Sequence, residues 1–131
     1  MLARLLKNRD GAQSLEFALT AIPLFLFLFG VIEFGRLYWV QSELQFAAEA
    51  AARYVTINPS ATASTVQAYA ATQVSADSVP NSDFTVTPYV SSTNTPACGN
   101  QVTVSYQFRF IIGQLFPYGP ITLTAEGCHN G

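Results

Sequence analysis

The sequence predicts an α+β protein in which one long N-terminal helix is followed by a second, short helix and a small antiparallel sheet of about three strands. Two observations predict this fold. The stretch from residue 9 to residue 55 is strongly apolar at first and then keeps apolar residues at helical spacing, whereas the C-terminal third alternates apolar and polar residues. The first pattern is typical of a long helix and the second of half-buried strands. The 131 residues suffice for one modest domain beside the helix.

The first half of the long helix is able to cross a membrane. No Asp, Glu, Lys or Arg occurs from Phe17 to Ile32, and a helix from Ala12 to Ile32 spans roughly 30 Å, the thickness of bilayer hydrocarbon. Three of the six basic residues fall within the first nine positions. The positive-inside bias therefore predicts a cytoplasmic N-terminus and an exported C-terminal part.

We expect three parts in the chain: a basic leader at residues 1–11, a transmembrane half-helix at 12–36 and an exported α+β domain at 37–131. The helix continues into the third part as an amphipathic segment, so its apolar stripe requires a partner. This stripe contains Leu37, Val40, Leu44, Ala48, Ala51 and Val55. The apolar face of the predicted sheet would cover it.

The remaining elements follow from local signals. Asn58-Pro59 is expected to end the long helix, and Ser60 to cap a second helix that runs to about residue 77. Strands are expected within residues 84–90, 102–112 and 121–126, where apolar and polar side chains alternate. Pro88 indicates that the first of these is an edge strand or contains a bulge, and short connections favour antiparallel pairing.

Cys98 and Cys128 both lie in the part predicted to be exported. A disulfide between them would close a loop for which chain entropy gives roughly 3–4 kcal/mol, and two free thiols are the alternative. A zinc site is not expected, because His129 beside Cys128 and a distant Cys98 make too few ligands. No other metal and no cofactor is expected.

The spacing around Gly11 predicts a processing site. Cleavage after Gly11 would remove the basic leader and leave a free amine on Ala12, four residues before Glu16. Two interpretations of Glu16 remain open: its carboxylate pairs with such an amine, or it lies at the level of the lipid headgroups. A carboxylate deep in lipid costs at least about 2.5–3.5 kcal/mol, so this position indicates function by default.

The segment GAQSLEF, from Gly11 to Phe17, resembles the prepilin-peptidase site of type IV pilins and pseudopilins. The wider stretch SLEFALTAIPLFLFLFGVIEFGR and the tail segments QVTVSYQFRF and LFPYGPITLTAEG resemble TadE-like minor pilins of tight-adherence (Flp) pilus systems. The resemblance implies cleavage before Ala12, methylation of the new N-terminus and helix packing in a filament or its initiating complex. It also implies that Glu16 pairs with the amine of an adjacent subunit. Major Flp pilins are far shorter, so a minor or priming subunit fits better.

Three further positions are candidates for docking between subunits. Pro23 interrupts the backbone bonding of the helix, and either provides a flexible point or makes a harmless kink; Thr20 is expected to satisfy the freed backbone group. Glu33 and Arg36 lie where the apolar run ends. They are expected to pair with each other or to be solvated, whereas the resemblance places Glu33 against a partner subunit. Interfacial aromatic residues follow at Tyr38 and Trp39.

Between the last two predicted strands, residues 113–120 read GQLFPYGP. Leu115, Phe116 and Tyr118 would form an exposed apolar loop that meets a partner, or a lid that folds back on a small core. The two alternatives remain open.

An enzyme is not expected. The only histidine is His129, and the chain has neither a phosphate-binding glycine loop nor an evident activated nucleophile. Outside the leader there is no basic patch for nucleic acid, and no small-molecule substrate is indicated.

The leading hypothesis is a single-pass subunit of the bacterial inner membrane, with a periplasmic or extracellular C-terminal domain. Its expected partners are prepilin peptidase, other pilin-like subunits and the pilus assembly machinery. The alternative is a permanently anchored periplasmic binding or scaffold module that does not polymerise.

Overall fold

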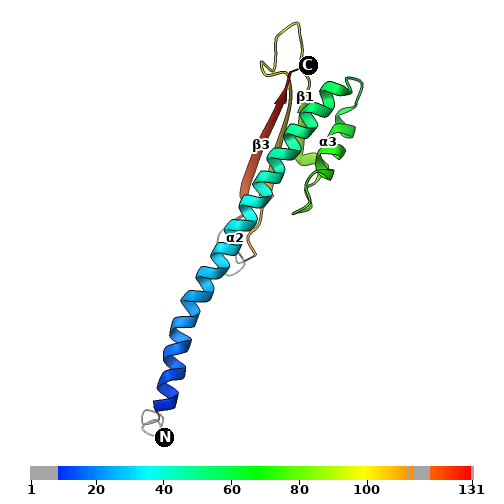
Figure 1. The fold of residues 1–131 in the computed structure, drawn as a ribbon. Coiled ribbons are helices and arrows are strands. Elements are labelled where there is room, and N and C mark those ends of the chain that lie inside the picture. Colours follow the sequence, from blue (N-terminus) through cyan, green and yellow to red (C-terminus); the bar gives the residue numbers. More distant parts are fainter. Residues whose placement is uncertain (1–8, 112, 114–118, 131) are drawn as a thin grey trace. The chain divides into compact units, whose positions relative to one another are not determined.

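The computed structural model describes residues 9–111, 113 and 119–130. It confirms the predicted α+β fold, with a three-stranded antiparallel sheet in the order β1-β2-β3 (Figure 1). In chain order the elements are α2 (Arg9–Ile57), α3 (Ala63–Thr72), the short 3-10 helix η1 (Asn81–Asp83), β1 (Phe84–Thr87), β2 (Asn100–Phe108) and β3 (Ile121–His129).

The chain divides into two compact units, and the division falls between Gly35 and Arg36. In the first unit, α2 passes through Pro23 without interruption. The large apolar side chains between Leu15 and Ile32 are 46–75% exposed. The Thr20 hydroxyl donates to the Glu16 carbonyl at 2.9 Å, not to the Leu19 carbonyl from which Pro23 withholds a hydrogen bond. The expectation for Thr20 was therefore wrong.

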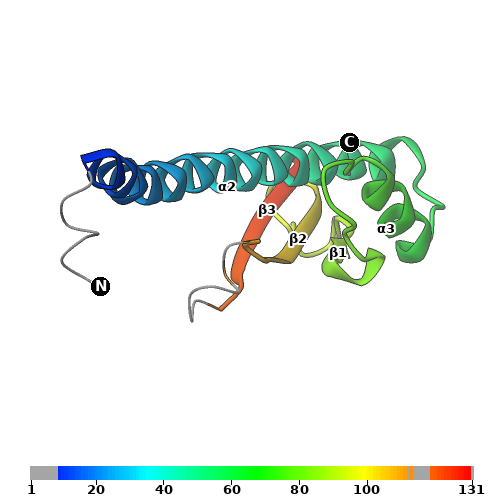
Figure 2. The same cartoon turned by 90° about the horizontal axis from the view of Figure 1, so that it is seen from below.

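The second unit, which we call the head, contains residues 36–131. Within it one side of α2 is covered, as the apolar stripe predicted. Leu37 is partly buried, and the remaining stripe residues are buried together with Ala47 and Ala52. The small alanine side chains of α2 allow β3 to lie close to the helix. At Gly127 of β3, an added Cβ would overlap the backbone of Ala48 and Glu49. Figure 2 shows α2 along the sheet and α3 beside β1.

The sheet follows the predicted alternation but has different strand ends. Val102, Val104 and Phe108 of β2 are buried and face the core. β2 ends at Phe108, which pairs with Ile121 at the start of β3, before the expected end at residue 112. β1 ends directly before Pro88, which has no N–H for the ladder.

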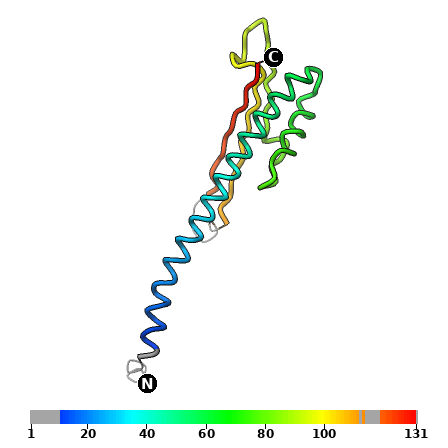
Figure 3. Tube along the Cα trace, viewed as in Figure 1, coloured from blue at the N-terminus to red at the C-terminus, as the bar shows by residue number. Residues whose placement is uncertain are grey.

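β3 runs beside β2 and forms one edge of the sheet (Figure 3). Side chains of α2 cover this edge. Gln41 donates to the Thr124 carbonyl at 2.9 Å, and Gln45 donates to the Glu126 carbonyl at 2.8 Å. Four residues of helix rise about 6 Å and two residues of strand rise about 6.8 Å. The two glutamines therefore match alternate carbonyls and keep the edge from pairing with another strand.

α3 is shorter than the sequence predicted. Its N-cap is Thr62 and not Ser60: the Thr62 hydroxyl accepts a hydrogen bond from the Thr65 N–H at 3.3 Å, within the first turn. It ends at Thr72, five residues before the expected end. Tyr69 of α3 stacks on Tyr54 of α2 with ring centroids 4.5 Å apart, which holds the two helices together.

Candidate functional site

The predicted processing segment lies at the start of α2. Gly11, Ala12, Glu16 and Phe17 are all exposed. Ala12 and Glu16 are one helical turn apart and lie on the same face. The segment is thus accessible, and an amine on Ala12 would lie within one turn of the carboxylate.

The apolar run is suited to a membrane. In the described part of the chain, one helix is long and apolar enough to cross a bilayer; its most apolar window has a mean hydropathy of 2.3 and no buried residues. The exposed side chains of residues 15–32 surround the helix on all sides. This segment therefore fits a single-pass membrane anchor.

Two of the predicted docking residues in the first unit differ in exposure. Pro23 is exposed within the apolar run. Glu33 is only 6% exposed, so the expectation that it is solvated was wrong. Burial of a carboxylate is costly unless it is paired or hydrogen-bonded. Glu33 therefore has a different environment from Glu16, whose carboxylate is exposed.

Arg36, the fourth predicted docking residue, makes three contacts inside the head. Its Nη2 donates to the Arg109 carbonyl at 2.8 Å and lies 3.8 Å from Oδ2 of Asp77. Its guanidinium also lies over the Phe108 ring, 4.4 Å from the centroid. Arg36 thus joins α2 to the end of β2 and to the segment after α3. The spacing of neighbouring residues does not indicate these partners, because they lie more than forty residues away in the sequence.

A polar cleft of about 620 Å³ adjoins Arg36, and its lining includes Asp77, Asp83, Tyr106 and Arg109. Burial raises the pKa of Tyr106, and a hydrogen bond to Asp77 with its negative charge raises it further, while Arg36 partly opposes them. The Tyr106 hydroxyl therefore stays protonated at neutral pH. The lining offers hydrogen-bonding and ion-pairing groups of both signs.

Glu43 is a structural residue that the sequence analysis missed. Its carboxylate accepts hydrogen bonds from the Ser75 N–H at 2.9 Å, the Ser75 hydroxyl at 2.7 Å, the Ala76 N–H at 2.7 Å and the Trp39 indole at 2.9 Å. Desolvation favours the protonated acid, but these bonds outweigh it and lower the pKa of Glu43 to about 2. The ionised Glu43 thereby holds the segment after α3 against α2.

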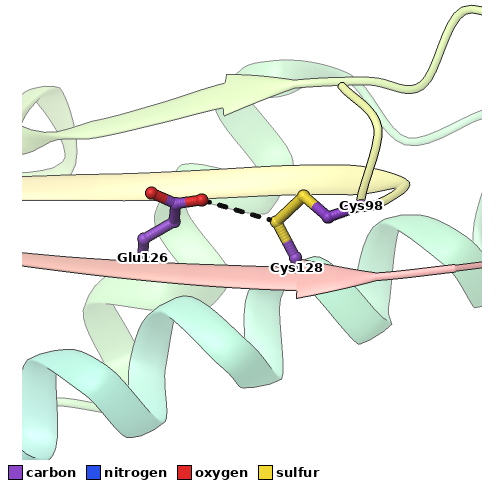
Figure 4. Close-up of side chains that lie close together, drawn as sticks. All are labelled: Cys98, Glu126 and Cys128. Carbon is purple, nitrogen blue, oxygen red and sulfur yellow. Dashed lines mark hydrogen bonds between the residues drawn. A yellow bond between two sulfur atoms is a disulfide. The ribbon is translucent and has the colours of Figure 1, made fainter. Parts of the chain in front are cut away.

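The expected disulfide between Cys98 and Cys128 is present, with Cα atoms 5.7 Å apart. Figure 4 shows Glu126 beside it, with its Oε1 3.6 Å from the Cys128 sulfur. A disulfide sulfur has no proton to donate, so this is a close contact; Oε1 instead accepts from Gln101 at 2.6 Å. The three side chains cluster as metal ligands would, but both sulfurs are bonded to each other and not available as thiolates.

Leu115, Phe116 and Tyr118, the predicted partner loop or lid, lie outside the described residues. Both interpretations of that loop stay predictions.

The described residues define a class of protein: an exposed, membrane-capable helix that continues into a disulfide-bonded α+β head. Residues 11–53 match the family model described as TadE-like protein, which confirms the resemblance for this segment. The match begins at Gly11, covers the apolar run and most of the buried stripe, and ends before α3. The tail segments that also showed the resemblance lie outside it. No curated protein and no solved structure matches the chain.

Proposed function

We propose that this protein is a minor pilin or pseudopilin that takes part in the assembly or initiation of a tight-adherence pilus after prepilin-peptidase cleavage following Gly11. One observation carries the proposal: the TadE-like match covers the exposed apolar helix and begins at the glycine of the processing segment. The role is structural and requires no catalytic group. The partners are other pilin-like subunits and the assembly machinery.

The proposed location is the bacterial inner membrane. The leader, with Arg4 and Lys7, stays in the cytoplasm, and the head lies in the periplasm or outside the cell. The Cys98–Cys128 disulfide supports an oxidising compartment for the head.

Assembly would exchange lipid around the apolar run for the helices of other subunits. Because residues 15–32 are exposed on all sides, several neighbouring helices are needed to cover them. A parallel neighbour displaced along the axis by about 6 Å, four residues of helix rise, brings its Ala12 amine level with Glu16. The resulting charge pair would fix the register between subunits more than it adds stability.

Processing and docking are tested with the full chain expressed beside its prepilin peptidase and pilus partners. Mass spectrometry should find an N-terminus at Ala12. A chain that keeps Met1 under these conditions would overturn the proposal and favour the permanently anchored binding or scaffold module.

The role of Glu16 is tested separately. Glu16→Ala should be cleaved and inserted normally but lost from the complex that copurifies with the partner subunits. Glu49→Ala, which removes an exposed acid outside the apolar run, is the matched control and should copurify as the wild type does. Normal copurification of Glu16→Ala would show that the carboxylate does not guide docking.

A further inference from the structure

Within the head, β1 covers only part of one edge of β2. β1 has four residues and β2 has nine, and their pairing begins at Phe84, which lies opposite Val104. Asp83, the residue before Phe84, belongs to η1, and its N–H donates to the Pro80 carbonyl at 3.1 Å. In the part of the chain that the structure describes, residues 105–108 of β2 therefore pair with β3 on one side and with no strand on the other.

The backbone groups of Ser105 and Gln107 point to the unpaired side of β2. Along an antiparallel strand, hydrogen-bonded and non-hydrogen-bonded pairs alternate with each neighbouring strand. The Phe84 N–H donates to the Asn81 carbonyl, and the Phe84 carbonyl accepts from Gln67 at 2.7 Å. Both groups of Phe84 are thus used away from β2, so the hydrogen bonds to β1 come from the odd-numbered residues of β2. The same alternation directs Ser105 and Gln107 toward the side of β1, beyond its first residue.

This short edge is open. Among the described residues, the Ser105 carbonyl and both the N–H and the carbonyl of Gln107 have no hydrogen-bond partner. Both residues line the polar cleft of about 620 Å³, so the edge faces open space. The window ends at the next odd-numbered residue, because the Arg109 carbonyl accepts from Arg36. Unpaired strand groups are a template for another extended chain.

Opposite charges lie at the two ends of the open edge. Asp83 and Arg109 both line the cleft. Asp77 in the same lining lies 3.8 Å from Arg36. Within the described part of the chain, no ion pair engages the half-buried Asp83 carboxylate or the exposed Arg109 guanidinium. A carboxylate that is partly removed from water favours a cation beside it. A segment that carries a base and an acid would therefore match this edge.

We propose that the open edge of β2 binds an extended segment of a partner pilin-like subunit, which adds a strand opposite Gln107 and places a Lys or Arg at Asp83 and an acid at Arg109. The proposal rests on the proposed function and names the surface of the head that the partner contacts. Main-chain hydrogen bonds would supply affinity, and the two charges would fix the position of the segment.

The length of the window favours a short segment over a second copy of this chain. The open groups span residues 105–107, with η1 at one end and the Arg36 side chain at the other. β2 of a second copy has nine residues and would extend past this window into η1. The edge of β3 is covered by Gln41 and Gln45. A segment with no neighbouring strands of its own fits the window.

Hydrogen exchange tests the added strand directly. The full chain, with its disulfide intact, is purified in detergent both alone and in the complex formed when it is expressed beside its prepilin peptidase and pilus partners. The Gln107 amide should exchange at least tenfold more slowly in the complex than in the chain alone. An amide that is already protected in the chain alone would mean that the chain itself or a second copy covers the edge, and would overturn the proposal.

Proline at position 107 tests the same bond by substitution. Because the Gln107 N–H points away from β3, proline there removes the open donor and leaves the β2–β3 ladder in place. Gln107→Pro should reduce the partner subunit that copurifies at least fivefold. Gln107→Ala, which keeps the N–H, should copurify as the wild type does. Equal copurification of Gln107→Pro and Gln107→Ala, with native near-ultraviolet circular dichroism, would overturn the added strand.

A charge variant keeps the test decisive even if the proline variant does not fold. Asp83→Lys should also reduce the copurified partner at least fivefold, whereas Ser82→Lys, which is exposed in the same turn and outside the cleft lining, should not. Equal copurification of these two variants would contradict the charge match. A wild-type chain that does not copurify with pilus subunits would count against the proposed function itself. A wild-type complex in which the Gln107 amide exchanges freely would overturn only the added strand.

Discussion

The two halves of α2 have the same secondary structure but opposite surroundings. Before Gly35 the large apolar side chains are exposed around the whole helix, whereas after Arg36 a single apolar stripe is covered by the rest of the head. The first half is rich in Leu and Phe, and the second is rich in Ala. Small side chains permit close packing of a helix on a sheet. Large apolar side chains on every side of a helix leave no polar face that water could solvate.

The difference shows what each half requires from its environment. At about 25 cal/mol per Å² of apolar surface, the exposure of the large side chains of residues 15–32 to water would cost on the order of 30 kcal/mol. Lipid or other helices must supply that burial. The apolar stripe of the second half is already buried within the head. Stability of the head and association of the helix are therefore separable properties.

Leucine truncation tests this separation most strongly. Leu44 is fully buried and Leu28 is 46% exposed. Leu44→Ala should lower the free energy of unfolding of the head by about 3 kcal/mol, through lost burial and the cavity that remains. Leu28→Ala should change it by less than about 0.5 kcal/mol, since surface substitutions have small effects. Urea unfolding in detergent micelles, followed by near-ultraviolet circular dichroism, measures both. Equal losses in the two variants would show that the two halves do not differ as described.

Glycine substitution is the second test. An added Cβ at Gly127 overlaps the backbone of Ala48 and Glu49, whereas at Gly35 it meets no atom within 4 Å. Gly127→Ala should cost the head about 2 kcal/mol, because β3 and α2 must move apart. Gly35→Ala removes a flexible residue from a helix interior and should be neutral or stabilising by about 0.5–1 kcal/mol. The same unfolding measurement applies, and an unaffected Gly127→Ala would contradict the close approach of β3.

The sequence analysis succeeded where the signal is local or periodic. The apolar run, the stripe on α2 and the alternation along β2 each follow from residues close together in the chain, and each was found. Errors at element ends have local causes: Thr62 and Ser60 are both good capping residues, and the sequence does not indicate which one forms the bond. Pro88 was assigned to an edge strand or a bulge; β1 is an edge strand of the sheet, but it ends before Pro88.

The polar contacts that join α2 to the rest of the head were not predicted, because they connect distant segments through single polar groups. Arg36 meets Asp77 and the Arg109 carbonyl across long sequence separations. Gln41 and Gln45 meet alternate carbonyls of β3, a match that depends on the relative direction of helix and strand. Neither the periodicity nor the composition of the sequence predicts the relative direction of α2 and β3.

Glu43 offers the smallest but most specific test of the covered half of α2. Its pKa is lowered to about 2 in the folded head from an ordinary value of 4.5. A lowered pKa stabilises the folded state fully above pH 4.5, and the contribution is lost as the pH falls from 4.5 to about 2. We expect about 1–2 kcal/mol at neutral pH, because solvent screens a partly exposed carboxylate and reduces what its hydrogen bonds contribute.

Glu43→Gln should therefore be less stable than the wild type at pH 7 by this amount. The glutamine amide keeps one acceptor oxygen but brings an NH₂ donor next to the N–H and O–H groups that donate to the Glu43 carboxylate. The difference should shrink steadily below pH 4.5 and disappear near pH 2. Unfolding curves at several pH values measure it, with Glu49→Gln, an exposed acid on the same helix, as the matched control. A difference between Glu43→Gln and the wild type that persists unchanged at pH 2 would mean that shape, not charge, holds Ser75 and Ala76 against α2.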